Sequence, residues 1–241
     1  YSRSSSFIEV SHPCSSMFPD FYRILNGISE IYRPQFSYFV LCLSNDSIRL
    51  SGCSVKHLFE KEVGIHLPTI GIARYEQGRI LCLGNISFLV NNKSDEGEIL
   101  SFLENMMNFV AGNVLGPMNV LLLDLYPKDA DCIQRIFRDF RCNFEIASDL
   151  KDKNLSKYSI IFIMSHCSYC DEIYDYVCKG GGLICSASFQ DDNPKKQFYI
   201  NRILSKCGIA FTPIQKKLKF RPKNVTQTSQ DPEELEPLTF P

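Results

Sequence analysis

The sequence contains no tryptophan, only four histidines, and no apolar run long enough to cross a membrane. Its longest apolar runs, at Tyr38–Leu43 and Ile160–Met164, fall far short of the roughly 20 residues that a membrane-spanning helix needs. An excess of one charge is missing as well, because 26 lysines and arginines face 27 aspartates and glutamates. A net charge of −1 creates no field that attracts nucleic acid or an anionic membrane. We therefore expect neither membrane insertion nor a nucleic-acid partner.

Catalytic motifs are missing too. The histidines at positions 12, 57, 66 and 166 do not form the His-Glu-x-x-His pattern of metallopeptidases. The one pair of glycines four residues apart, Gly112 and Gly116, has Val114 at its centre instead of a nucleophile. Asp124 ends an apolar stretch, where α/β folds place ligand-binding groups, but such an aspartate is more often a helix cap. The sequence thus predicts no catalytic residue, no cofactor and no enzymatic activity.

Apolar residues (44%) and cysteines (11) are abundant, and a chain of 27.6 kDa with this composition can bury a real core. Several cysteines, among them Cys42, Cys82 and Cys185, lie inside apolar runs, where the thiol behaves as a small hydrophobe. A disulfide framework is not expected in so long a chain, so we favour a reducing, cytoplasmic location, with a cytoskeletal or ciliary one included. A secreted protein is the alternative, because five Asn-x-Ser/Thr sequons begin at Asn45, Asn85, Asn92, Asn154 and Asn224.

The segment His166-Cys167-Ser168-Tyr169-Cys170 follows an apolar run and offers the most conspicuous candidate site. A Cys-x-x-Cys pair at a helix start can be a redox centre, and with His166 it supplies three candidate metal ligands. No second ligand pair at zinc-site spacing exists, so we expect a structural role for His166, Cys167 and Cys170 and no metal. The glycines 180–182 lie between a helix and a strand, an order typical of a helix C-cap and unlike a phosphate-binding loop.

Hydrophobic periodicity predicts helices that alternate with continuous apolar strands over most of the chain. That alternation indicates a parallel sheet covered on both faces, within a three-layer α/β sandwich of the flavodoxin-like kind. An antiparallel extension precedes it, in which Glu76-Gln77-Gly78 forms a hairpin turn. The expected strands are 37–43, 48–50, 69–74, 79–83, 120–125, 143–147, 159–164, 183–187 and 209–213, and the expected helices are 21–31, 94–112, 129–140, 171–179 and 197–206.

The two ends differ from this core. Residues 1–20, rich in serine, are predicted to be a disordered arm, residues 21–213 a single α/β domain, and residues 214–241 an extended tail or linker. Proline and charge prevent the tail from forming a helix of its own. Its basic half is the predicted partner-binding segment, with Lys216, Lys217, Lys219, Arg221 and Lys223 expected to contact an acidic surface.

Three stretches together resemble one family, the TRPM8 channel-associated factors (TCAF). They are the opening segment Phe21–Ile31, the strand pair around Tyr75–Asn85, and the Tyr176-Val-Cys-Lys-Gly-Gly-Gly-Leu-Ile segment, in the same order and at similar spacing. The resemblance implies a class I glutamine-amidotransferase-like (ThuA-like) sandwich, which in that family precedes an enhancin-type (M60-like) metallopeptidase domain. The amidotransferase nucleophile is absent here, so no catalytic residue carries over.

This resemblance, with the missing motifs, leads us to expect a non-catalytic protein-interaction or scaffold module of a larger protein or assembly. Its partner would be another protein: a membrane channel, a peptidase domain or a cytoskeletal component. The alternatives are a structural component of a ciliary microtubule or other cytoskeletal array, an accessory domain of an M60-like metallopeptidase, or a metal or redox protein that uses cysteine and histidine.

Overall fold

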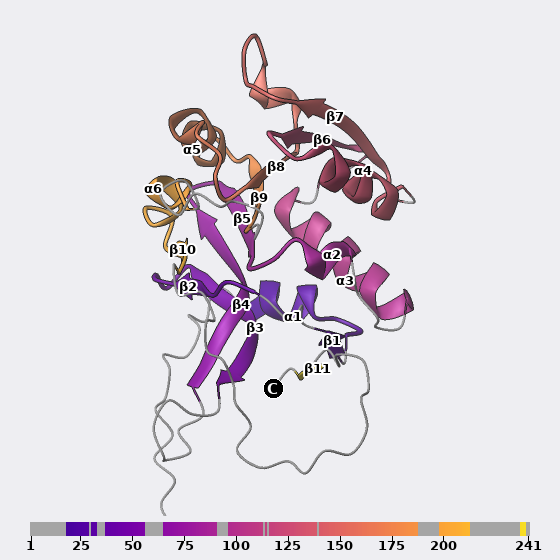
Figure 1. Cartoon of the computed structure of the whole chain (residues 1–241), viewed down its shortest axis with the longest axis vertical. Coiled ribbons are helices and arrows are strands. Elements are labelled where there is room, and N and C mark those ends of the chain that lie inside the picture. The colour runs from indigo at the N-terminus through magenta and orange to yellow at the C-terminus, as the bar shows by residue number, and fades with distance from the viewer. Residues whose placement is uncertain are drawn as a thin grey trace, which may run out of the picture.

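A computed structural model describes residues 18–28, 30–32, 37–55, 65–90, 96–112, 114, 116–138, 140–187, 198–212 and 237–239. Within them, a seven-stranded sheet runs through the middle of the molecule with helices on both faces (Figure 1). The predicted three-layer α/β sandwich with a mostly parallel sheet is therefore confirmed. The strand order is β3-β4-β5-β9-β8-β6-β7.

Five neighbouring strands of this sheet are parallel: β5 (Gly78–Leu83), β9 (Gly182–Ser186), β8 (Ile160–Met164), β6 (Met118–Leu123) and β7 (Cys142–Ala147). Every residue of β8 and β9 is buried, which explains why their sequences are continuously apolar rather than alternating. The predicted strands 120–125, 143–147, 159–164 and 183–187 therefore share one parallel sheet, as expected.

The antiparallel extension consists of β3 (Ser47–Val55) and β4 (Ile65–Tyr75), and β4 pairs in turn with β5. The predicted hairpin turn joins β4 to β5, and Glu76 adopts a left-handed conformation there (φ 50°). Arg74 on β4 donates a hydrogen bond from Nη2 to Asp20 Oδ1 at 2.8 Å. This ion pair ties the first helix to the extension.

Two apolar clusters lie on opposite faces of the sheet. One face is covered by α1 (Phe18–Ile24), α2 (Ser87–Val90), α3 (Glu96–Val110) and α4 (Pro127–Ile136), as Figure 1 shows. The other is covered by α5 (Cys170–Cys178), α6 (Asn201–Leu204) and the small antiparallel pair β2 (Val40–Cys42) and β10 (Ile209–Phe211). Because both faces are covered, β8 and β9 bury all their side chains.

Three of the differences between the expected and the observed elements change the architecture most. The first helix ends at Ile24 instead of residue 31, because Gly27 turns the chain with a positive φ of 78° before Pro34 is reached. The expected helix 197–206 is reduced to the single turn α6. The last expected strand, β10, pairs with β2 and does not join the main sheet.

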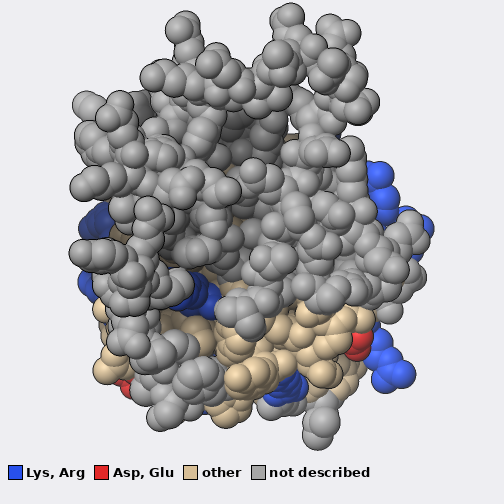
Figure 2. Space-filling view, turned by 90° about the horizontal axis from the view of Figure 1, so that it is seen from below, with Lys and Arg blue, Asp and Glu red and all other residues tan. Residues whose placement is uncertain are grey.

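At the end of the chain, β11 (Pro237–Thr239) pairs antiparallel with β1 (Glu30–Tyr32). The predicted disordered arm falls almost wholly on residues outside the described part of the chain. Among the described residues of the face in Figure 2, uncharged side chains predominate and lysines and arginines are scattered. No helix in the described ranges is both long and apolar enough to cross a membrane.

Candidate functional site

The strand order brings together two neighbouring strands, β6 and β8, whose following helices lie on opposite faces of the sheet. The chain leaves β6 through α4, which packs on one face of the sheet, and leaves β8 through α5, which packs on the other. β6 and β8 are nevertheless neighbours, so their connections diverge at their carboxyl ends. In open α/β sheets, ligands bind at such a divergence, the topological switch point. We take this position as the candidate functional site.

Three side chains meet at this switch point. Asp124 directly follows β6 and His166 follows β8, and His166 Nε2 lies 3.8 Å from Asp124 Oδ2. The Tyr126 ring, just before α4, lies with its centroid 6.0 Å from that of the His166 imidazole. The side chain of Asp124 is 42% exposed and that of His166 17% exposed, so both can be reached from solvent. We call Asp124, Tyr126 and His166 the switch-point cluster.

The backbone holds Asp124 in an uncommon conformation. Its φ of 52° lies in the left-handed region, which aspartate tolerates better than most residues. The Asp124 N–H donates to Ala147 O at 2.9 Å, which continues the pairing of β6 with β7. Next to His166, Ser165 is fully buried, and its Oγ has no hydrogen-bond partner among the described residues. An unsatisfied buried hydroxyl of this kind is uncommon outside sites that bind water or a ligand.

The two cysteines of the predicted motif do not belong to this cluster chemically. Burial raises the pKa of the Cys167 thiol to about 12, and burial likewise raises the pKa of Cys170. The Cys170 Sγ donates weakly to Cys167 O at 3.8 Å and to Tyr199 O at 3.7 Å. A nucleophilic or redox-active cysteine has a lowered pKa, so both thiols have the low reactivity of buried core cysteines. The nine cysteines whose side chains are described are all free.

A zinc ion does not fit the described residues. No group of three or more histidine, cysteine or acidic side chains there is arranged to hold a metal ion. His166 Nε2 lies 3.8 Å from Asp124 Oδ2, whereas Cys167 and Cys170 are buried, and the three predicted candidates are not among any such group. The predicted partner-binding residues Lys216, Lys217, Lys219, Arg221 and Lys223 lie outside the described residues.

Sequence reasoning named Asp124 and His166 separately and missed Tyr126. The available signal was that each polar residue directly follows an apolar strand, since carboxyl ends of parallel strands share one edge of the sheet. Their proximity depended on β8 pairing with β6, which the sequence does not specify.

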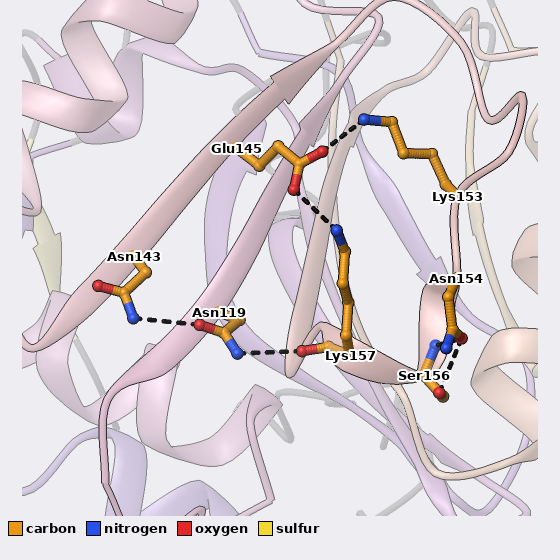
Figure 3. A network of polar contacts seen from close by, with 7 residues as sticks. All are labelled: Asn119, Asn143, Glu145, Lys153, Asn154, Ser156 and Lys157. Atoms are coloured by element: carbon orange, nitrogen blue, oxygen red, sulfur yellow. Dashed lines mark hydrogen bonds and ion pairs between the residues drawn. The ribbon is translucent and has the colours of Figure 1, made fainter.

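A second polar cluster, which involves other side chains, surrounds the outer strand β7 (Figure 3). Glu145 on β7 forms ion pairs with Lys153 and with Lys157, the latter at 3.1 Å. Hydrogen bonds from the lysines, first of all Lys153, lower the pKa of Glu145 to about 2. These contacts tie the segment that leads from β7 to β8 to the side of β7.

Two asparagines extend this edge cluster, as Figure 3 shows. Asn143 donates to Asn119 Oδ1 at 3.1 Å, and Asn119 donates to Lys157 O at 3.1 Å. Asn154 accepts hydrogen bonds from the backbone and hydroxyl of Ser156 and begins the 3-10 helix Leu155–Lys157. The edge cluster is therefore structural.

No protein-family model matches the chain, and no curated protein matches it. Solved structures of the IMPa metallopeptidase from Pseudomonas aeruginosa share its fold. One, in complex with an O-glycopeptide, has a TM-score of 0.58 at 12% identity and is matched over 80% of this chain. Another, in complex with T-antigen, has a TM-score of 0.57 at 14% identity. This chain spans about a fifth of their length, 21% in each case.

These neighbours correct our expectation about function. We expected a non-catalytic scaffold module and no enzyme, with a ciliary or cytoskeletal component as an alternative, yet the solved structures that share the fold are metallopeptidases. The expectation rested on the absence of catalytic motifs from this sequence, whereas the metallopeptidase structures that share the fold are matched over only 21% of their length.

Proposed function

We propose that this chain is a domain of an M60-like metallopeptidase, the accessory-domain alternative from the sequence. The observation that supports it is the fold match over 80% of the chain to a metallopeptidase. The three sequence stretches that resemble the TCAF family support the same placement, because there too an α/β sandwich accompanies an M60-like peptidase domain. The zinc-binding residues of the enzyme would lie outside residues 1–241, since this sequence lacks His-Glu-x-x-His.

The proposed substrates are O-glycosylated proteins. This substrate class comes from the similar structures, one of which holds an O-glycopeptide and another T-antigen. The domain would contribute to the peptidase by binding and positioning the substrate, since the described residues provide no metal-binding group. The basic residues 216–223 would contact an acidic surface of the peptidase domain, with an affinity that falls as salt is added.

The test uses the full-length gene product that contains this chain. It is incubated with an O-glycosylated protein and with the same protein after enzymatic removal of its O-glycans, and the products are identified by mass spectrometry. We expect cleavage of the glycosylated form alone, loss of cleavage with a zinc chelator, and recovery when zinc is restored. Absence of cleavage of either protein by zinc-loaded enzyme would overturn the proposal.

A further inference from the structure

The charges around the switch-point cluster restrict the ligands it can accept. Burial, and then the nearby carboxylates of Asp149 and Asp124, raise the pKa of Tyr169. The first turn of α5 adds two further acidic residues, Asp171 and Glu172. So acidic a surrounding opposes phosphate, sulfate or carboxylate ligands, even though the amino ends of α4 and α5 are close by. A ligand that donates hydrogen bonds and carries no negative charge is favoured.

The cluster also offers an aromatic surface beside the carboxylate. Tyr126 is 38% exposed although it is large and apolar, and it lies against the imidazole of His166. A carboxylate accepts hydrogen bonds at two oxygens, and an exposed tyrosine ring provides a flat apolar surface with a polar tip. Together these groups suit a sugar, whose hydroxyls donate to a carboxylate while the C–H groups of its ring lie on an aromatic face.

We propose that Asp124, Tyr126 and His166 form a binding site for a neutral sugar of the substrate glycan. Asp124 accepts hydrogen bonds from two neighbouring hydroxyls, Tyr126 stacks on the sugar ring, and His166 offers a further polar contact. The choice of a sugar rests on the proposed function, whereas the position and chemistry of the site come from the fold. A divalent cation is disfavoured because no third ligand joins Asp124 and His166 among the described residues.

The test measures sugar binding to this chain directly. The sequence has only four histidines, so the His166 imidazole signal can be followed by NMR and assigned by comparison with H166Q. T-antigen is titrated to about 10 mM, where a ligand with Kd near 1 mM is about nine-tenths bound. We expect a saturable shift of the His166 signal, and we expect Asp124→Asn and Tyr126→Ala each to weaken binding about tenfold or more.

Two matched variants control for folding and for surface effects. Asp152→Asn removes the charge of another exposed aspartate with positive φ (60°), and Tyr22→Ala removes another exposed tyrosine. Both should bind T-antigen within twofold of the parent, and circular dichroism should show all variants folded. No His166 shift, a shift produced by calcium chloride in place of the sugar, or equal loss in test and control variants would overturn the site.

The outcome is separable from that of the proposed function. Peptidase activity of the full-length protein without sugar binding at this cluster would refute the sugar site alone. If the chain binds the sugar, D124N does not, and the full-length protein cleaves nothing, the sugar site is supported and the peptidase assignment is refuted.

Discussion

The centre of the sheet and its β7 edge are stabilised in different ways. Every residue of β8 and β9 is buried, with apolar clusters on both sides. In β7 no residue is fully buried, and Ile146 is 51% exposed. The edge relies on pairing with β6 and on the ion pairs of Glu145 with two lysines. The centre of the sheet is therefore stabilised by close apolar packing, whereas the β7 edge is stabilised by backbone pairing together with polar contacts.

This difference also bears on the candidate functional site. The switch-point cluster lies where two central strands end, so rigid buried strands hold Asp124 and His166. A site supported by buried strands keeps its geometry better than one on a solvated edge. The edge cluster, although richer in charge, consists of side chains that satisfy one another. Charge density by itself is therefore a poor criterion for choosing the candidate site.

The largest effect should come from removing a central aromatic ring. Phe162 on β8 is 1% exposed, and we expect Phe162→Ala to lower the free energy of unfolding by about 3–5 kcal/mol. Phe144 on β7 is only partly buried against the same cluster. Phe144→Ala should therefore cost less than about 2 kcal/mol. Urea unfolding of both variants measures the difference, and equal losses would show that the edge is as tightly packed as the centre.

Thiol reactivity should show the same contrast. Burial raises the pKa of Cys142, at the start of β7, to about 11, and it raises the pKa of the fully buried Cys185 on β9 well above its ordinary value. Iodoacetamide reacts with the thiolate form of cysteine. At pH 8 Cys185 should therefore be alkylated on the order of 100-fold more slowly than Cys142, a rate ratio that corresponds to about 2.7 kcal/mol of activation free energy. Peptide mass spectrometry over time resolves the two sites. Similar rates would mean that the centre opens as readily as the edge.

The sequence predicted best those elements that have a strong local pattern, such as a continuous apolar run. β6, β8 and β9 were recognisable because burial on both faces requires continuous apolar residues, as in Ile160–Met164. The hairpin before β5 was recognisable from its turn residues. The end of the first helix was predicted too late in the sequence, because Pro34 was taken as the residue that stops it. The turn at Gly27 ends the helix earlier.

The candidate site was predictable only in part. Asp124 and His166 each follow an apolar strand, and that rule of α/β folds needs no coordinates. Their contact requires that β8 insert beside β6 although β7 comes between them in the chain, and long-range pairing of this kind leaves no local pattern. The structural similarity to metallopeptidases does not follow from catalytic motifs, because it lies in the fold and His-Glu-x-x-His is absent from this sequence.

A smaller effect is expected at the glycines that lead into the centre. A Cβ on Gly182 would lie 2.4 Å from Val110 O and 2.8 Å from Ser159 O, both backbone atoms. Gly182→Ala should thus cost about 1–3 kcal/mol, because backbone segments must move apart. Gly180 has a positive φ of 98°, and a Cβ there would meet no atom closer than 3.5 Å, so Gly180→Ala should cost about 1 kcal/mol. Thermal unfolding compares them, and a larger loss at Gly180 would contradict the steric explanation.

The smallest effect concerns the edge and depends on pH. Glu145 has its pKa lowered from 4.5 to about 2, chiefly by the hydrogen bond from Lys153. A carboxylate with a lowered pKa stabilises the fold above its unfolded pKa, and this stabilisation is lost as pH falls toward the folded pKa. The stability difference between the parent and Glu145→Gln should therefore be constant above about pH 5 and disappear between about pH 4.5 and pH 2.

Because Glu145 and its lysines are solvent-exposed, the difference should be small and should shrink further in 1 M salt. Urea midpoints at several pH values measure it, with Glu104→Gln, at an exposed position on α3, as the matched control. If the edge is held mainly by pairing with β6, Glu145→Gln will still fold with the same cooperativity, and only the pH dependence will change. If Glu145→Gln loses the same stability at every pH, the Glu145 side chain acts through packing. The β7 edge would then be stabilised in the same way as the apolar centre, and the contrast between the two regions would not hold.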